Sequence, residues 1–345
     1  MKYNILGNTG LIVSELCFGT MTFGAKGRFK AIGGVDQKSA DDLMKQVVDA
    51  GVNFIDTANV YSEGLSEEIT GKAIQNAGIS RESLILATKV RGGMGEGPNQ
   101  KGLTRKHILD QVDASLKRLN TDYIDLYQIH SNDPITPIDE TLRALDDLVR
   151  SGKVRYIGAS NVAAWQLMKA LDYSKYNNAA RFASLQAYYT IAGRDLEREI
   201  IPLLQEEKVG LMVWSPLAGG LLSGKYDRKD TKTGGRRDDF DFPPINKERA
   251  FDIIDALGPM AEKKGASVAQ LSIAWLLQQK TVTSVIIGAK NKEQLADNLK
   301  STEVQFTEDE LKNLDEISQL PKEYPGWMLE FTKEDRKVDS RHSAS

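Results

Sequence analysis

Several residue types and patterns that would mark a protein's class are scarce in this chain of 345 residues. The single cysteine, Cys17, excludes an internal disulfide and a zinc site made of several thiolates, and it fits a reducing compartment. Three histidines are too few to favour a metal site built from several imidazoles. No apolar run approaches the roughly 18 residues of a membrane-spanning helix, and the first residues lack the apolar core of a secretory signal. We therefore expect a cytoplasmic protein with no metal and no membrane insertion.

The charge is nearly balanced, with 45 basic and 48 acidic side chains and a formal net charge of −3. Such a balance provides no general attraction to nucleic acid or anionic lipid, so a small-molecule partner is the better expectation. Hydrophobic residues make up 41% and charged residues 27%, which is typical of a folded globular chain rather than a disordered one.

Short β-branched runs alternate with longer segments of helical spacing, and this pattern predicts βαβ units and a parallel sheet. The amphipathic segments include residues 39–50, 104–119 and 138–150. We count eight strand-helix pairs, and the predicted strands are residues 15–19, 53–57, 84–89, 123–130, 156–160, 183–187, 210–214 and 284–288. Eight pairs match the (β/α)8 barrel better than a doubly wound sheet, which usually has about six strands.

We predict a single domain over residues 1–320, which also includes segments outside the strand-helix pairs. Two short runs around Asn8-Thr9-Gly10 predict a hairpin that caps the bottom of the barrel. The polar segment 225–248 predicts a long loop after the seventh strand, which we interpret as a lid or cofactor clamp. Residues 308–320 predict one further helix, and residues 321–345 a charged tail that is partly mobile.

Titratable side chains stand where three consecutive predicted strands end. Asp56 ends the second strand, with Tyr61 five residues later, Lys89 ends the third and His130 the fourth. The carboxyl ends of barrel strands converge on one cavity, so we expect these four residues together. An ammonium at Lys89 would lower the pKa of Tyr61, Asp56 would hold that ammonium, and neutral His130 would orient a carbonyl oxygen. This set suits protonation of an oxygen while hydride reaches its carbon.

A resemblance to a known protein family rests on seven motifs, taken here in chain order. They are FIDTANVYSEGLSEEITGKAI, ATKV, DLYQIH, IGASN, SLQAYY, WSPLAGGLLSGKY and IIGAKNKEQLADN, and together they span nearly the whole chain. The sequence resembles the aldo-keto reductase superfamily, and within it a bacterial branch that also resembles the potassium-channel β subunits. The resemblance implies that Asp56, Tyr61, Lys89 and His130 are the catalytic tetrad, with Tyr61 as general acid in reduction and general base in oxidation.

The same resemblance implies a bound nicotinamide dinucleotide. Its contacts fall on Gly19, Thr20, Met21, Asp56, Ser160, Asn161, Gln186, Trp214, Ser215, Pro216, Leu217, Gly219, Lys225, Gly288, Lys290, Gln294, Asp297 and Asn298. Trp214 is an alternative to Tyr188 as the ring that stacks on the nicotinamide. Amides at the start of the helix after Gly288 suit phosphates, and Lys290 suits a 2′-phosphate, so we expect NADP rather than NAD.

The residues leave three functions open. The first is an NADP-dependent oxidoreductase acting on aldehydes, ketones or sugar-like carbonyls. The second is a lyase in which Lys89 forms a Schiff base, although the strand-seven and strand-eight motifs have no role in it. The third is a regulatory subunit that holds NADP and turns over slowly. We expect the pocket rim to come from residues 21–23, 92–97, 132–133 and 225–248, with Asn132 and Asp133 suited to a hydroxylated substrate. The sequence leaves the oligomeric state open.

Overall fold

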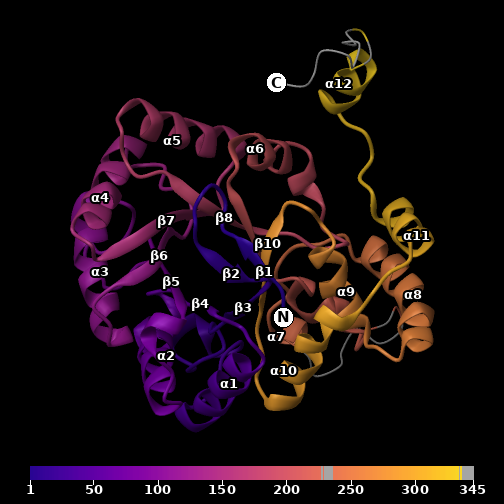
Figure 1. Ribbon diagram of the computed structural model, residues 1–345, viewed down its shortest axis with the longest axis horizontal. Coiled ribbons are helices and arrows are strands. Elements are labelled where there is room, and N and C mark those ends of the chain that lie inside the picture. The colour runs from indigo at the N-terminus through magenta and orange to yellow at the C-terminus, as the bar shows by residue number, and fades with distance from the viewer. Residues whose placement is uncertain (227, 229–235, 334, 336–345) are drawn as a thin grey trace.

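The computed structural model describes residues 1–226, 228, 236–333 and 335. Eight strands form a closed barrel in which every neighbouring pair is parallel (Figure 1). They are β3 (Leu16–Gly19), β4 (Phe54–Asp56), β5 (Ile85–Val90), β6 (Ile124–Ile129), β7 (Val154–Ser160), β8 (Phe182–Tyr188), β9 (Gly210–Trp214) and β10 (Val282–Ile287). All eight predicted strands are present, with bounds shifted by at most two residues, and the predicted (β/α)8 class is confirmed.

One helix after each strand surrounds the barrel (Figure 1). These are α1 (Gln37–Asp49), α2 (Leu65–Asn76), α3 (Arg105–Leu119), α4 (Ile138–Arg150), α5 (Ala164–Tyr176), α6 (Ile200–Glu207), α9 (Val268–Leu277) and α10 (Lys292–Leu299). In α4 the buried Leu142, Leu145 and Leu148 recur at spacing three and so lie on one face. Acidic residues in its first turn complement the helix dipole.

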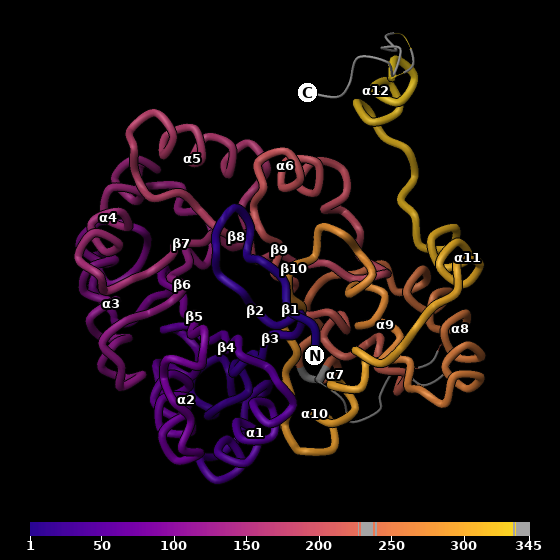
Figure 2. The backbone as a smooth tube through the Cα atoms, viewed as in Figure 1, coloured from indigo at the N-terminus to yellow at the C-terminus, as the bar shows by residue number. Residues whose placement is uncertain are grey.

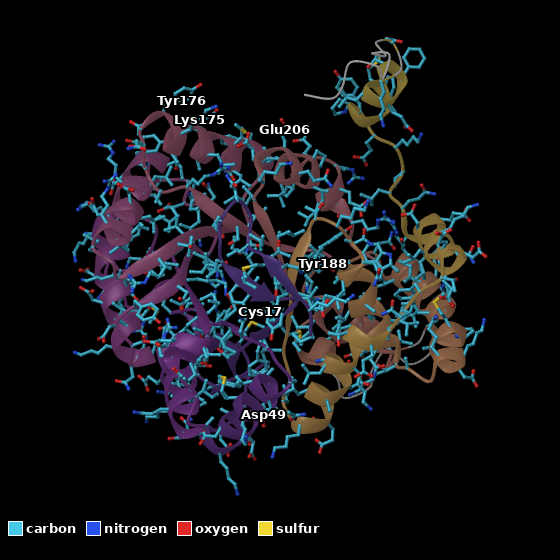
Figure 3. The ribbon with its side chains drawn as sticks, in the orientation of Figure 1. Cys17, Asp49, Lys175, Tyr176, Tyr188 and Glu206 are labelled. Carbon is cyan, nitrogen blue, oxygen red and sulfur yellow. The ribbon has the colours of Figure 1, made fainter. Side chains whose placement is uncertain are left out.

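The N-terminal hairpin of β1 (Tyr3–Ile5) and β2 (Ile12–Ser14) closes the amino end of the barrel (Figure 2). Leu6 and Val13 are fully buried against the barrel interior, where they join Cys17, Phe54 and other apolar side chains. Figure 3 shows Cys17 near the barrel centre, and burial raises the pKa of its thiol well above the usual value. The hairpin therefore seals one end of the barrel and leaves the carboxyl ends of the strands as the open end.

In the part of the chain that the structure describes, three further helices lie outside the strand-helix repeat, α8 (Lys247–Lys264), α11 (Glu308–Ser318) and α12 (Gly326–Thr332), together with a single turn, α7 (Arg236–Asp239). The predicted helix at 308–320 corresponds to α11, which packs against α8. The sequence analysis missed α8, whose buried Ile253, Ile254 and Leu257 face the core. It also missed α12, which lies apart from the barrel (Figure 1). Parts of the predicted loop at 225–248 and of the tail fall outside the described residues.

None of the helices in the described part of the chain is long and apolar enough to cross a membrane.

Candidate active site

Asp56, Lys89 and His130 meet at the carboxyl ends of three adjacent strands. Asp56 is the last residue of β4, Lys89 is next to last in β5, and His130 directly follows β6. Because β4 pairs with β5 and β5 with β6, the three side chains reach one end of the barrel from neighbouring positions. The sequence prediction that these strand ends converge is in accord with this placement.

The central contact is an ion pair inside the barrel. Lys89 Nζ lies 2.5 Å from Asp56 Oδ2, and both side chains are almost completely excluded from solvent. The same ammonium donates to the carbonyl of Thr57 at 2.9 Å and to the hydroxyl of Tyr61 at 3.4 Å. Its three protons thus have three acceptors, so the position of the charge is fixed.

Two glutamines hold the other oxygen of Asp56. The Nε2 atoms of Gln128 and Gln186 donate to Asp56 Oδ1 at 3.0 and 2.9 Å. The sequence analysis missed Gln128, although it lies two residues before His130 and therefore on the same face of β6. Gln186 was predicted as a dinucleotide contact, whereas its side-chain Nε2 donates to Asp56 and to Gln128 Oε1.

Tyr61 reaches this cluster from a strained turn. The short 3-10 segment η2 (Tyr61–Gly64) has φ of 49° at Ser62, 59° at Glu63 and 94° at Gly64. Positive φ at two consecutive non-glycine residues costs free energy, and such strain is concentrated at functional sites. The turn sends the chain back into α2 directly after Tyr61, which fixes the ring beside Lys89.

His130 stands beside the tyrosine as a neutral imidazole. Its ring lies edge-on to that of Tyr61, with centroids 5.7 Å apart. Burial first, and then the positive charges of Lys89, Arg28 and Arg91, lower the pKa of His130 to about 3. The expected neutral form is therefore the form this environment favours near neutral pH.

Lys89 lowers the pKa of Tyr61, as expected, but the net pKa is raised. Burial raises the pKa of Tyr61 more than the charge of Lys89 lowers it, and the Asp56 carboxylate adds to the rise. For Lys89, burial acts to lower the pKa, but Asp56 and Tyr61 together outweigh it and the net pKa is raised. The phenol therefore stays protonated, mainly because it is buried, and Lys89 stays charged because of its contacts with Asp56 and Tyr61.

The residues predicted to hold a dinucleotide occupy the remaining arc of the same barrel end. They follow β7, β8, β9, β10 and β3, which are consecutive neighbours in the closed sheet. The loop after β9 contains Ser215, Ala218, Gly219 and Gly220, all with positive φ. A side chain at Gly220 would meet nothing within 4 Å, so this turn leaves room for an approaching ligand. Gly288 and Lys290 are exposed directly before the first turn of α10.

Several of these residues already have partners within the protein. Asn161 donates to the carbonyl of His130 and accepts from Trp214 Nε1, both at 3.0 Å. The carboxylate of Asp297 accepts from Ser267 and Gln270. The Nδ2 of Asn298 donates to the carbonyl of Gly288, and Gln294 Oε1 accepts from the amide of Lys290. The side chain of Thr20 contacts Ser66 and Thr70 behind the strand, so only its backbone faces the open end.

Aromatic rings cover the end of β9. Trp214 lies 5.1 Å from Tyr188 and 5.9 Å from Phe242, and the planes of Trp214 and Phe242 differ by only 8°. Phe242 belongs to the segment that the sequence identified as a lid or clamp. Its backbone carbonyl lies so close to Gly219 that a Cβ there would be 2.3 Å away, which requires glycine at that position.

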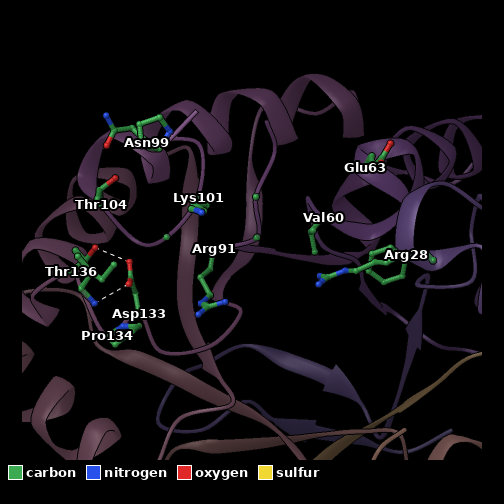
Figure 4. A pocket seen from close by; sticks show the side chains of 16 residues that line it. Arg28, Val60, Glu63, Arg91, Asn99, Lys101, Thr104, Asp133, Pro134 and Thr136 are labelled. Atoms are coloured by element: carbon green, nitrogen blue, oxygen red, sulfur yellow. Dashed lines mark hydrogen bonds between the residues drawn. The ribbon is translucent and has the colours of Figure 1, made fainter. Parts of the chain in front are cut away.

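A cavity of about 660 Å³ adjoins the tetrad on the side of β5 and β6 (Figure 4). Its lining includes Gly92, Gly93 and Asp133, which belong to the predicted rim, and Arg91, which does not. Phe23 is not a rim residue, because it is fully buried against Phe18. The carboxylate of Asp133 accepts from two backbone amides and from Thr136 (Figure 4), so it is engaged within the protein.

Comparisons with known proteins agree with this geometry. The family model described as "Aldo/keto reductase family" matches residues 15–319. The chain is 39% identical over 327 residues to an uncharacterized oxidoreductase, YrpG, of Bacillus subtilis, covering 92% of this chain and 96% of that protein. A probable voltage-gated potassium channel subunit beta of Arabidopsis thaliana is 37% identical, with 88% and 92% covered. The versiconal hemiacetal acetate reductase of Aspergillus parasiticus is 35% identical, with 92% and 96% covered.

Proposed function

The chain belongs to the aldo/keto reductase family of oxidoreductases, and from that premise we propose that it transfers hydride between NADP and an aldehyde, ketone or sugar-like carbonyl. The observation that carries the proposal is the contact chain from Asp56 through Lys89 Nζ to the hydroxyl of Tyr61, with neutral His130 beside the tyrosine ring. Each of these groups has a distinct task in protonating a carbonyl oxygen.

Tyr61 is the proposed general acid. Its phenol is the one strong O–H donor of the cluster, and its raised pKa keeps the proton available at neutral pH. As charge develops on the phenolic oxygen, Lys89 at 3.4 Å stabilises it without having to move. In the oxidation direction the phenolate takes the proton back.

Asp56 and His130 position the reacting groups. Asp56 keeps Lys89 charged, and Gln128 and Gln186 fix the carboxylate by holding its second oxygen. Neutral His130 has a ring N–H that can donate to the substrate oxygen without competing to protonate it fully. The carbonyl would therefore rest between the hydroxyl of Tyr61 and the imidazole of His130.

The cofactor would lie along the arc from β7 to β3, and when bound it supplies the hydride. Trp214 offers an aromatic face near the reacting end, and the turn at residues 215–220 leaves open space at Gly220 for the pyrophosphate. The N-terminus of α10 and the exposed cation of Lys290 suit the 2′-phosphate, which favours NADP over NAD. The internal contacts of Asn161, Asp297 and Asn298 would hold these loops in place for that purpose.

The proposal is tested by following the absorbance of the reduced nicotinamide with a panel of aldehydes, ketones and sugars. NADPH and NADH are compared at equal concentration. We expect steady turnover of several carbonyl compounds, with a higher kcat/KM for NADPH. The Lys290→Ala variant should lose most of that cofactor preference, while the exposed Lys300→Ala variant on the opposite end of α10 should keep it.

Because the chain is similar to a probable potassium channel β subunit, a second candidate function is that of a regulatory subunit. Such a protein would bind NADPH tightly and show only slow turnover with every compound of the panel, so the same experiment decides between the two. The Schiff-base alternative is disfavoured, because that chemistry needs a neutral amine and the Asp56 pair keeps Lys89 charged.

A further inference from the structure

Two arginines reach into the cavity beside the tetrad from different elements. Arg28 belongs to the 3-10 turn η1 (Gly27–Phe29), and Arg91 follows β5. Both line the cavity, and Figure 4 shows the two guanidinium groups extending into the same space. The cavity volume of about 660 Å³ lies within the range of sites for small organic ligands.

Each guanidinium is held in place while its charge is left without a carboxylate partner. The Cζ of Arg28 lies 5.1 Å from the centroid of the Phe29 ring, and Arg91 Nε donates to the carbonyl of Asn132 at 3.1 Å. Throughout the described part of the chain, neither arginine forms an ion pair. Arg91 has a φ of 138°, which residues other than glycine rarely adopt, so the backbone at this position is strained.

The acidic residues of the cavity offset these charges only in part. Asp133 is occupied by the amides of Leu103 and Ile135 and by Thr136. Glu63 is exposed and belongs to the turn after Tyr61. Lys101 adds a third cation to the lining, so the cationic groups outnumber the carboxylates.

The cavity neighbours the proposed reaction site through Phe29 and Val60, while Asp56, Tyr61, Lys89 and His130 themselves lie outside its lining. Phe29 lies in its wall, and the ring of Phe29 contacts the ring of Tyr61 edge-on with centroids 5.4 Å apart. Val60, which precedes Tyr61, also lines it. The positive charges of Arg28 and Arg91 act together with burial and Lys89 to lower the pKa of His130, so both arginines lie within electrostatic reach of the catalytic end. A substrate whose carbonyl contacts Tyr61 would extend past Phe29 toward the two guanidinium groups.

We propose that the substrate is a carbonyl compound that also carries an anionic group, a carboxylate or a similar oxyanion, bound by Arg28 and Arg91. The inference rests on the proposed function for the carbonyl end and on the arginines for the anionic end. Guanidinium groups bind planar carboxylates through paired N–H donors, and among the described residues the terminal nitrogens of both arginines have no hydrogen-bond acceptor. Of the two residues expected to bind a hydroxylated substrate, Asp133 has its carboxylate engaged by the amides of Leu103 and Ile135 and by Thr136.

The test compares 4-carboxybenzaldehyde with its methyl ester, using the full chain with NADPH. The two compounds share the ring and the aldehyde and differ in one negative charge. We expect kcat/KM for the acid to exceed that for the ester by at least about tenfold, which corresponds to about 1.4 kcal/mol, and the preference to shrink as salt is added. Equal values for the two compounds would overturn the inference and leave the proposed function intact.

Variants assign the preference to these residues. Arg28→Gln and Arg91→Gln should each lower kcat/KM for the acid roughly tenfold and change that for the ester by less than about twofold. Arg91→Lys should restore part of the loss, and Glu63→Gln should increase the preference for the acid because it removes the opposing charge. Arg143→Gln, on the outer face of α4, is the matched control and should change neither value. Equal losses for acid and ester in both arginine variants would contradict the assignment.

A binding measurement separates the two proposals. Calorimetry compares 4-(hydroxymethyl)benzoate with the corresponding benzamide on the NADPH complex. Tighter binding of the benzoate that Arg91→Gln abolishes would support the anion site even if no aldehyde were reduced, an outcome that would refute the proposed function alone. Equal binding of the two alcohols would refute the anion site.

Discussion

The buried pair of Lys89 and Asp56 should be indispensable to the fold as well as to the chemistry. Lys89 is fully buried and Asp56 almost so, and their charged atoms are 2.5 Å apart. Removing one partner leaves an uncompensated charge in the barrel interior, which costs about 3–5 kcal/mol of unfolding free energy. The Asp56→Asn variant should reach the upper part of that range, because Asp56 accepts from three donors on two oxygens and asparagine has only one oxygen.

The Lys89→Met variant should cost less, about 3 kcal/mol, because the carboxylate of Asp56 keeps two amide donors. In the double variant no buried charge is left unpaired, so its cost should be at least about 3 kcal/mol smaller than the sum of the two single costs. Urea unfolding followed by tryptophan fluorescence measures all four proteins, with Lys225→Met as the control for loss of an exposed ammonium. Single costs below about 1 kcal/mol, or strictly additive costs, would refute the reasoning.

Three further predictions concern pH and packing. Because the pKa of folded His130 is about 3 and that of an unfolded histidine about 6.5, the unfolding free energy of the wild type should decrease as the pH falls below 6.5. The loss should reach about 2.7 kcal/mol at pH 4.5 and should be absent from His130→Gln; parallel acid unfolding curves of the two proteins would contradict this. Because the pKa of Tyr61 is raised above 10, kcat for reduction should stay level to about pH 9 while oxidation increases with pH; a decline in reduction centred near pH 8 would count against it. Gly71→Ala should lower the unfolding free energy by about 2 kcal/mol, since its Cβ would lie 2.5 Å from the carbonyl oxygen of Leu119. Gly258→Ala in α8 has open space around the new Cβ and should raise the unfolding free energy by about 0.5–1 kcal/mol. The urea unfolding curves of the two variants should therefore shift in opposite directions.

The period of the apolar runs was enough to predict the barrel, and strand-end position was enough to predict that Asp56, Lys89 and His130 lie at one end of it. Parallel strands that are buried on both faces appear in the sequence as apolar runs. Closure of the barrel brings their carboxyl ends together, independently of the conformations of the loops. The helix α8 escaped prediction because it begins at Lys247, inside the polar segment 225–248 that was interpreted as a loop. The apolar residues of α12 are exposed and spaced too irregularly to indicate a helix packed on the barrel.

The electrostatics of the site depended on contacts that the sequence does not specify. The direction of the Tyr61 pKa follows from a balance between burial and two opposite charges, which requires their positions. Gln128 and Gln186 are ordinary strand residues until barrel closure brings them to one carboxylate. Arg28 and Arg91 are 63 positions apart and share a cavity only because the turn at η1 lies over the end of β5.

The most direct test of the central claim is the rate of hydride transfer in Tyr61→Phe, measured as single-turnover loss of NADPH absorbance with an excess of a carbonyl substrate. The account predicts a rate at least about a hundredfold below wild type, since proton donation contributes about 10² to 10⁴ in rate. It also predicts NADPH affinity within about threefold of wild type and an unchanged rate in the exposed control Tyr176→Phe. A Tyr61→Phe protein that oxidises NADPH at the wild-type rate would contradict the role of this tyrosine and with it the mechanism.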